Sequence, residues 1–155
     1  MESAAAARIV VGLLQDPYLN VRLSACNILG LSGDARYVTA LRPLLGDPKT
    51  ERMALYSLSL LGDAQIRPRL MAMIQGEASN APYAIENLGR IRDPNDVPFF
   101  RSILRCGEEA KILGAVKGIR SWSVAKSALY DDLCRLAAHG HEEAMLVAAE
   151  VGNPD

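Results

Sequence analysis

The sequence has few aromatic residues, few cysteines and no excess of charge of either sign. Aromatic side chains make up 5% of the 155 residues, and 17 Lys and Arg stand against 18 Asp and Glu, so the formal net charge is −1. A binder of nucleic acid or of a membrane surface normally needs a positive field, so both partner classes are disfavoured. The three cysteines are odd in number and far apart, which excludes a disulfide scaffold.

Long apolar runs and export signals are also lacking. No stretch reaches the roughly 18 apolar residues that a membrane-spanning helix needs, and residues 1–7 lack the basic start of a secretory signal. Cysteines without a pairing pattern fit a reducing compartment, so we expect a cytoplasmic protein. Half of the residues are apolar, which is ample for a core and excludes a disordered chain.

The sequence does contain an internal repeat of about thirty residues. Asp34, Asp63 and Asp93 are 29 and 30 residues apart, and each follows a similar segment. Three positions of that segment keep their residue type, and their members are Ala25, Ala54 and Ala84, then Leu29, Leu58 and Leu88, then the small residues Gly30, Ser59 and Gly89. A weaker fourth copy spans 113–121, and a fifth spans 142–153.

Apolar residues three and four positions apart indicate that each repeat is a pair of amphipathic helices. The Asp-Pro pairs at 16–17, 47–48 and 93–94 predict helix starts, with a capping oxygen before a proline at the first helical position. Gly33 and Gly62 predict left-handed helix stops. Helices are expected at 3–15, 18–31, 35–45, 48–61, 64–75, 80–91, 94–106, 108–120, 122–138 and 141–151. No segment alternates with period two, so the predicted fold class is all-α.

The motif Val21-Arg22-x-x-Ala25-x-x-x-Leu29-Gly30-x-x-Gly33-Asp34 resembles the HEAT-like repeat of the short, bacterial, phycobilin-lyase type. The resemblance covers residues 10–121 and weakens in the fourth copy, where Lys117 and Ser121 replace the Leu and the Asp. It implies a right-handed α-α superhelix, a solenoid of about five stacked helix pairs in which one helix of each pair lines a concave surface. Residues 1–155 would form one array, with units 3–33, 34–62, 63–92, 93–121 and 122–153, the last two degenerate.

In such an array the constant positions face the core and the variable positions face solvent or a partner. Variable positions four residues apart share one face of the second helices. The members with partner-binding character on this face are Asn27, Arg52, Tyr56, Glu86, Arg90 and Lys111. Tyr and Arg give much binding energy per residue, and mixed charge suits a protein or peptide better than a phosphate backbone. The same pattern is equally typical of a solvated inner face.

No motif of a known catalytic site is present, and the only suggestive cluster is His139-Gly140-His141-Glu142-Glu143. HEAT-like enzymes of the deoxyhypusine hydroxylase type hold two irons through several His-Glu pairs in different repeats, whereas this chain has one such pair. A metal site needs three or more converging ligands. We therefore expect no metal and no cofactor, and a polar turn with acidic residues at a helix N-terminus.

Other charged and aromatic positions have structural explanations. Arg22 and Arg52, together with the aspartates that end the repeats, are expected to make caps and hydrogen bonds between repeats rather than a ligand site. Trp122 lies where the fourth copy loses its Gly-Asp turn. It either fills a looser junction between repeats, which we favour, or is exposed as an anchor for a partner.

The two ends of the sequence are unusually apolar. Residues 4–14 and 144–151 carry one charge each, Arg8 and Glu150. Solenoid ends normally present a polar outer face. The ends therefore predict self-association or membership of a longer array, unless the Ala-rich helices simply tolerate exposure.

Together these features favour a non-enzymatic protein-protein interaction module, a scaffold or adaptor that binds a protein or peptide on the concave face. The alternative is a chromophore-lyase-like subunit that acts on a bilin and a phycobiliprotein, which the resemblance implies. A DNA-binding HEAT-like protein is a third hypothesis, and the neutral charge argues against it. The identity of the partner does not follow from the residues.

Overall fold

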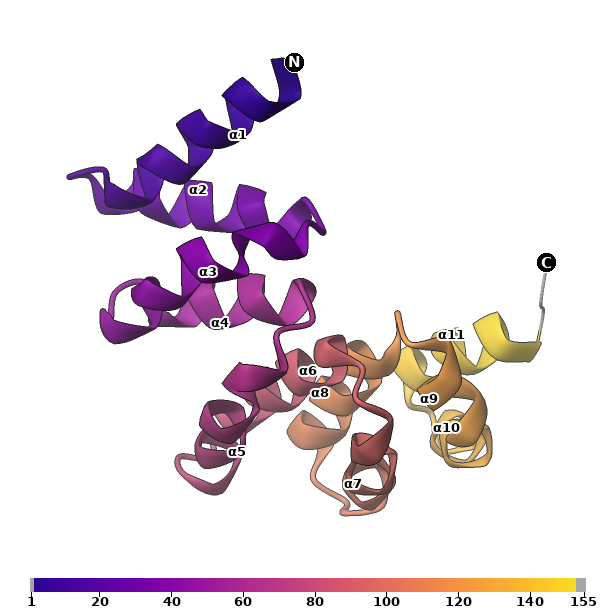
Figure 1. Cartoon of the computed structure of the whole chain (residues 1–155). Coiled ribbons are helices and arrows are strands. Elements are labelled where there is room, and N and C mark those ends of the chain that lie inside the picture. Colours follow the sequence, from indigo (N-terminus) through magenta and orange to yellow (C-terminus); the bar gives the residue numbers. More distant parts are fainter. Residues whose placement is uncertain (1, 153–155) are drawn as a thin grey trace. The chain divides into compact units, whose positions relative to one another are not determined.

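The computed structural model describes the backbone of residues 2–152 and the side chains of residues 6–151 (Figure 1). Within this range all regular structure is helical and no strand occurs, so the predicted all-α class is confirmed. Contacts join mainly helices that are close in sequence. No helix in the described range is long and apolar enough to cross a membrane.

The helices fall into two compact units, divided after Ile66. The first contains α1 (Glu2–Gly12), η1 (Leu13–Gln15), α2 (Leu19–Leu31), η2 (Ala35–Tyr37), α3 (Val38–Leu41), η3 (Arg42–Gly46), α4 (Glu51–Leu60) and η4 (Ala64–Ile66), where η denotes a 3-10 helix. The second contains α5 (Arg67–Gln75), α6 (Ala81–Ile91), η5 (Pro94–Asp96), α7 (Val97–Leu104), α8 (Glu109–Ile119), α9 (Ser123–Ala128), α10 (Tyr130–Ala138) and α11 (Glu142–Gly152).

In the first unit, α2 and α4 lie against each other and carry most of the core (Figure 1). The helix α1 with η1 packs on α2, and α3 with η3 packs on α4. Leu29 and Leu58, which occupy a constant position of the repeat, are buried in the core between these helices. Each helix pair thus buries its apolar face against the next pair, as the repeat predicts.

The second unit is arranged in the same way. The helices α6, α8 and α11 contact one another in that order, and α5, α7 and α10 pack on them in turn. Trp122 is only 4% exposed and its ring meets that of Phe100 edge to face, with 6.1 Å between the ring centroids. Trp122 therefore fills the core of this unit, and its alternative interpretation as an exposed anchor is wrong.

Glycines allow α6 and α8 to approach each other closely. A Cβ atom at Gly118 would lie 2.8 Å from the carbonyl oxygen of Glu86, and one at Gly114 would lie 2.5 Å from that of Pro82. The small residues of the repeat are thus needed for helix contact rather than for backbone freedom. In the first unit Gly30 approaches Ser57 in the same manner.

The Asp-Pro pairs do not begin α-helices directly, contrary to the prediction. The carboxylates of Asp16 and Asp47 accept hydrogen bonds from the backbone N–H groups two residues on, at 2.8 and 2.9 Å. This bond closes a turn, so α2 and α4 begin only at Leu19 and Glu51. Asp93 caps the 3-10 helix η5 in the same way, and α7 begins after it.

Two predicted helices differ most from the structure. The segment expected to be helical at 35–45 is mostly 3-10 helix, with only Val38–Leu41 in α-helical form. The helix expected at 122–138 is broken at Leu129, where φ is −113° and the side chain is buried. The predicted left-handed stops at Gly33 and Gly62 are confirmed, with φ of 69° and 72°.

Candidate functional site

Three of the predicted partner-binding residues lie in the first unit. Asn27 is half-buried on α2, whereas Arg52 is exposed and Tyr56 half-buried on α4. The Cys26 Sγ donates a hydrogen bond to the Ser57 Oγ at 3.4 Å, and this contact joins α2 to α4. Asn27 and Tyr56 are the sequence neighbours of these two residues. The structure therefore brings together the two helices that carry these three residues.

The other three lie in the second unit, and their charges are compensated locally. Glu86 and Arg90 form an ion pair one turn apart on α6, and Arg90 also donates to the Asn87 Oδ1 at 3.0 Å. Lys111 on α8 pairs with Glu108, with 2.8 Å between Nζ and Oε2. These pairs present a face of mixed charge rather than a field of one sign.

This face does not extend along α8. Ala115 and Ile119 occupy the next variable positions of the repeat, and both are fully buried in the unit in which α11 packs on α8. Residues that vary between repeats are therefore not all surface residues. In the fourth repeat the variable positions belong to the core, so a binding face on α8 is restricted to its first turns.

The structural interpretation of the charged repeat positions is confirmed for Arg22 and Asp63. The Nη1 of Arg22 donates to the backbone oxygen of Asp16 at 2.9 Å and so holds the turn before its own helix. Asp63 accepts two hydrogen bonds from the guanidinium of Arg42, from Nε at 2.9 Å and from Nη2 at 2.8 Å. This second contact joins the first helix of a repeat to the turn that ends it.

Equivalent links between Arg and Asp recur in the second unit, and sequence reasoning missed them. The Nε of Arg67 donates to the Oδ1 of Asp96 at 3.2 Å, and Asp132 is surrounded by three arginines. The sequence did contain a signal for these links. Arg42 and Arg101 occupy matching positions of the repeat, and each directly follows a residue of the core. The aspartates are buried, so each link supplies a buried carboxylate with the hydrogen-bond donor that it needs.

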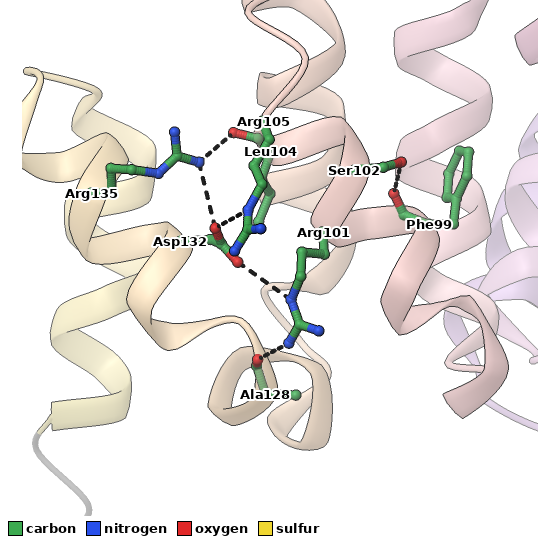
Figure 2. A network of polar contacts seen from close by, with 8 residues as sticks. All are labelled: Phe99, Arg101, Ser102, Leu104, Arg105, Ala128, Asp132 and Arg135. Carbon is green, nitrogen blue, oxygen red and sulfur yellow. Dashed lines mark hydrogen bonds and ion pairs between the residues drawn. The ribbon is translucent and has the colours of Figure 1, made fainter.

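Figure 2 shows the links at Asp132, which lies in the first turn of α10. The Nε of Arg105 lies 2.7 Å from Oδ1, the Nε of Arg101 lies 3.5 Å from Oδ2, and the Nη2 of Arg135 lies 3.5 Å from Oδ1. Burial raises the pKa of Asp132, but the hydrogen bond from Arg105 and the three positive charges outweigh it, so the pKa lies below its ordinary value.

Both histidines near the C-terminus contact backbone groups close to them in the sequence. The Nδ1 of His141 accepts a hydrogen bond from the backbone N–H of Ala144 at 3.4 Å and thus caps the start of α11. The Nδ1 of His139 lies 2.7 Å from the backbone oxygen of Arg135. In the range that the structure covers, no group of three or more His, Cys, Asp and Glu is placed to hold a metal ion.

Large apolar side chains are exposed in both units. In the first unit they are Ile9, Tyr18, Ile28 and Leu31, and in the second Val124, Tyr130, Met145 and Leu146. The side chains of Ala4 and Ala5, part of the apolar N-terminal segment, lie outside the described range. Self-association through the ends of the chain stays a prediction.

No protein-family model matches the chain, and a search of curated proteins also finds no match. The resemblance to HEAT-like repeats therefore stays a prediction made from the repeat itself. What the structure defines is an all-α protein in which neighbouring helix pairs pack against each other within each unit.

Proposed function

We propose that this chain is a non-enzymatic protein-binding module, a scaffold or adaptor that binds a protein or peptide through the second helices of its repeats. The partner-binding residues of this proposal are those named from the sequence: Asn27, Arg52, Tyr56, Glu86, Arg90 and Lys111. The proposal includes a single HEAT-like array, because the thirty-residue repeat continues through residue 66 without a change in its pattern.

The observation that carries the proposal is the way the helix pairs are tied together. The buried Asp63 and Asp96 link parts of the chain 21 and 29 residues apart, through Arg42 and Arg67. Such links and the close glycine contacts hold neighbouring helices of each unit together and so provide a rigid support. A rigid support lowers the conformational entropy that side chains such as Tyr56 lose on binding a partner.

The test is capture of a partner from a lysate of the native host. The triple variant Arg52→Ala, Tyr56→Ala, Arg90→Ala removes two cations and the aromatic ring from the proposed face, and we expect it to lose the protein that the wild-type chain retains. Removal of central Tyr and Arg residues commonly costs about 2 kcal/mol or more each, or roughly thirtyfold in affinity. Helix content measured by circular dichroism should not change.

A matched control is the triple variant Tyr18→Ala, Arg36→Ala, Lys117→Ala. It removes the same number of cations and one tyrosine from exposed positions outside the face. It should retain the partner as well as the wild type does. Equal capture by both triple variants would contradict the proposed face, and a change of bilin absorbance on mixing would instead favour the lyase-like alternative.

A further inference from the structure

The links between Arg and Asp do not all contain the same number of arginines. In the described part of the chain, Asp63 pairs with Arg42 alone and Asp96 with Arg67 alone. Asp132 is approached by Arg101, Arg105 and Arg135 (Figure 2). We call these four residues the Asp132 cluster. One arginine is enough to satisfy the buried carboxylate at the other two links, so this cluster has two more than the fold requires.

The arrangement of the Asp132 cluster leaves its positive charges facing solvent. The side chain of Asp132 is 5% exposed, whereas those of Arg101, Arg105 and Arg135 are 43%, 57% and 47% exposed. The carboxylate therefore lies beneath the guanidinium groups. Three positive charges around one negative charge leave a net charge of about +2 at a single point, and like charges this close repel each other.

Acidic residues beside the cluster in the sequence do not cancel this charge. Asp131 is exposed and forms no ion pair among the residues that the structure describes. Glu108 pairs with Lys111, with 2.8 Å between Oε2 and Nζ. The surplus of two positive charges in the Asp132 cluster therefore has no partner within the described chain.

The guanidinium groups are held in place and still have donors to spare. The Nη2 of Arg101 donates to the backbone oxygen of Ala128 at 2.7 Å, and the Nη2 of Arg135 donates to that of Leu104 at 3.1 Å. Both Nη groups of Arg105 and the Nη1 groups of the other two arginines make no hydrogen bond in the described structure. Fixed, unused donors of this kind are what a bidentate contact to an oxyanion needs.

We propose that the Asp132 cluster binds a phosphate monoester, the group that a phosphorylated peptide carries. A phosphorylated side chain has a charge of about −1.5 to −2 at pH 7 and three acceptor oxygens, which matches the charge and the donors of the cluster. The charge is concentrated at one point and the chain as a whole has a net charge of −1, so a compact dianion fits better than an extended nucleic acid. The cluster lies on α7 and α10 and contains none of the partner-binding residues proposed on α2, α4, α6 and α8.

The test is the binding of a fluorescein-labelled Gly/Ser peptide with one central phosphoserine, followed by fluorescence anisotropy at low ionic strength. We expect it to bind at least about tenfold more tightly than the same peptide with serine, because charge-assisted hydrogen bonds are strong. Inorganic phosphate should compete, because it carries a similar charge and the same acceptor oxygens. Equal affinity of the two peptides, absence of competition by inorganic phosphate, or tighter binding of a DNA oligonucleotide would each overturn the proposal.

Two variants locate the site. Arg105→Gln removes the most exposed arginine of the cluster but leaves Arg101 and Arg135 on Asp132, so the fold is expected to persist. Its affinity for the phosphopeptide should fall about tenfold. Arg120→Gln, at a similarly exposed arginine that pairs with Glu150, removes the same charge elsewhere in this unit and should change the affinity little.

Fluorescence of Trp122 shows whether the unit is still packed, because this ring touches Phe100 next to Arg101. An unchanged spectrum together with the loss of affinity in Arg105→Gln alone would support the site. An equal loss in Arg105→Gln and Arg120→Gln would show a general effect of charge and would overturn it. The result does not depend on the binding face proposed on α2, α4, α6 and α8, because the peptide is supplied directly.

Discussion

Arg92 occupies the left-handed backbone position that ends α6, with φ of 61°. The first two repeats place Gly33 and Gly62 at the equivalent position, where a residue without a Cβ atom has no steric cost. An L-residue with a side chain loses roughly 1–2 kcal/mol there. The third repeat therefore has a strained residue, Arg92, at a left-handed position that the first two repeats fill with glycine.

At the residue scale, the change Arg92→Gly is expected to stabilise the protein. Relief of the strain is partly offset by the greater entropy of glycine in the unfolded chain, so the free energy of unfolding should rise by about 0.5–1 kcal/mol. Urea unfolding measures this value. Arg92 also donates to the Ser121 Oγ at 3.3 Å, an exposed hydrogen bond that the change removes.

The control for that hydrogen bond is Arg92→Ala, which removes it but keeps a Cβ atom in the left-handed conformation. The glycine variant should be more stable than the alanine variant. If the two are equally stable, the backbone strain inferred at this position is wrong.

A second prediction at this scale concerns acid. The pKa of Asp132 lies below its ordinary value of 3.8 in the folded protein, so the unfolded chain takes up this proton at a higher pH than the folded one. The resulting stabilisation is present above that ordinary value and is lost as the pH falls through the lower, folded value. Asp132→Asn should therefore flatten the decline in the free energy of unfolding between about pH 5 and pH 2.

The matched control is Asp131→Asn, which changes the exposed carboxylate next to it. This variant should keep the steep decline of the wild type, because Asp131 forms no ion pair in the described structure. Urea unfolding at several pH values gives both slopes. Equal slopes for the two variants would mean that Asp132 does not contribute to acid unfolding.

At the element scale, the contact between α6 and α8 depends on the absence of side-chain atoms. A Cβ atom at Gly118 would meet the backbone of Glu86 at 2.8 Å, and a backbone cannot move aside as a flexible side chain can. Overpacking of this kind costs typically about 1–3 kcal/mol. Gly118→Ala is therefore expected to lower the free energy of unfolding by that amount in a urea titration.

Gly12→Ala is the control for the general effect of replacing a helical glycine. Gly12 ends α1, and no atom lies within 4 Å of the position that a Cβ atom would take there, so alanine fits without strain. This change should raise the free energy of unfolding by about 0.4–1 kcal/mol. A loss of stability in both variants would show that crowding is not the cause at Gly118.

The sequence predicted the helices better than their ends. Periodicity located each helix because apolar residues must recur on one face to be buried. The starts were predicted early at Asp16 and Asp47, since the carboxylates bind the next turn and delay the helix. The break at Leu129 had no local signal, because it depends on the burial of that side chain in the core of the second unit.

At the scale of the whole molecule, the candidate site was only partly accessible from the sequence. The repeat correctly indicated that Arg22 and Asp63 are structural. It could not show that Lys111 pairs with Glu108, or that Ala115 and Ile119 are buried in the unit in which α11 packs on α8. Which variable position is buried depends on contacts between helices, and the spacing of the repeat does not determine those contacts.

The sequence by itself determined the helical class, the positions of the helix pairs and the glycine stops, because propensity and periodicity are local properties. Only the tertiary structure decided that three arginines meet at Asp132, with Arg135 on α10 and Arg101 on α7. Those residues are 34 positions apart in the sequence. They share one carboxylate because α7 and α10 pack together, so an electrostatic site of this kind exists only in the folded chain.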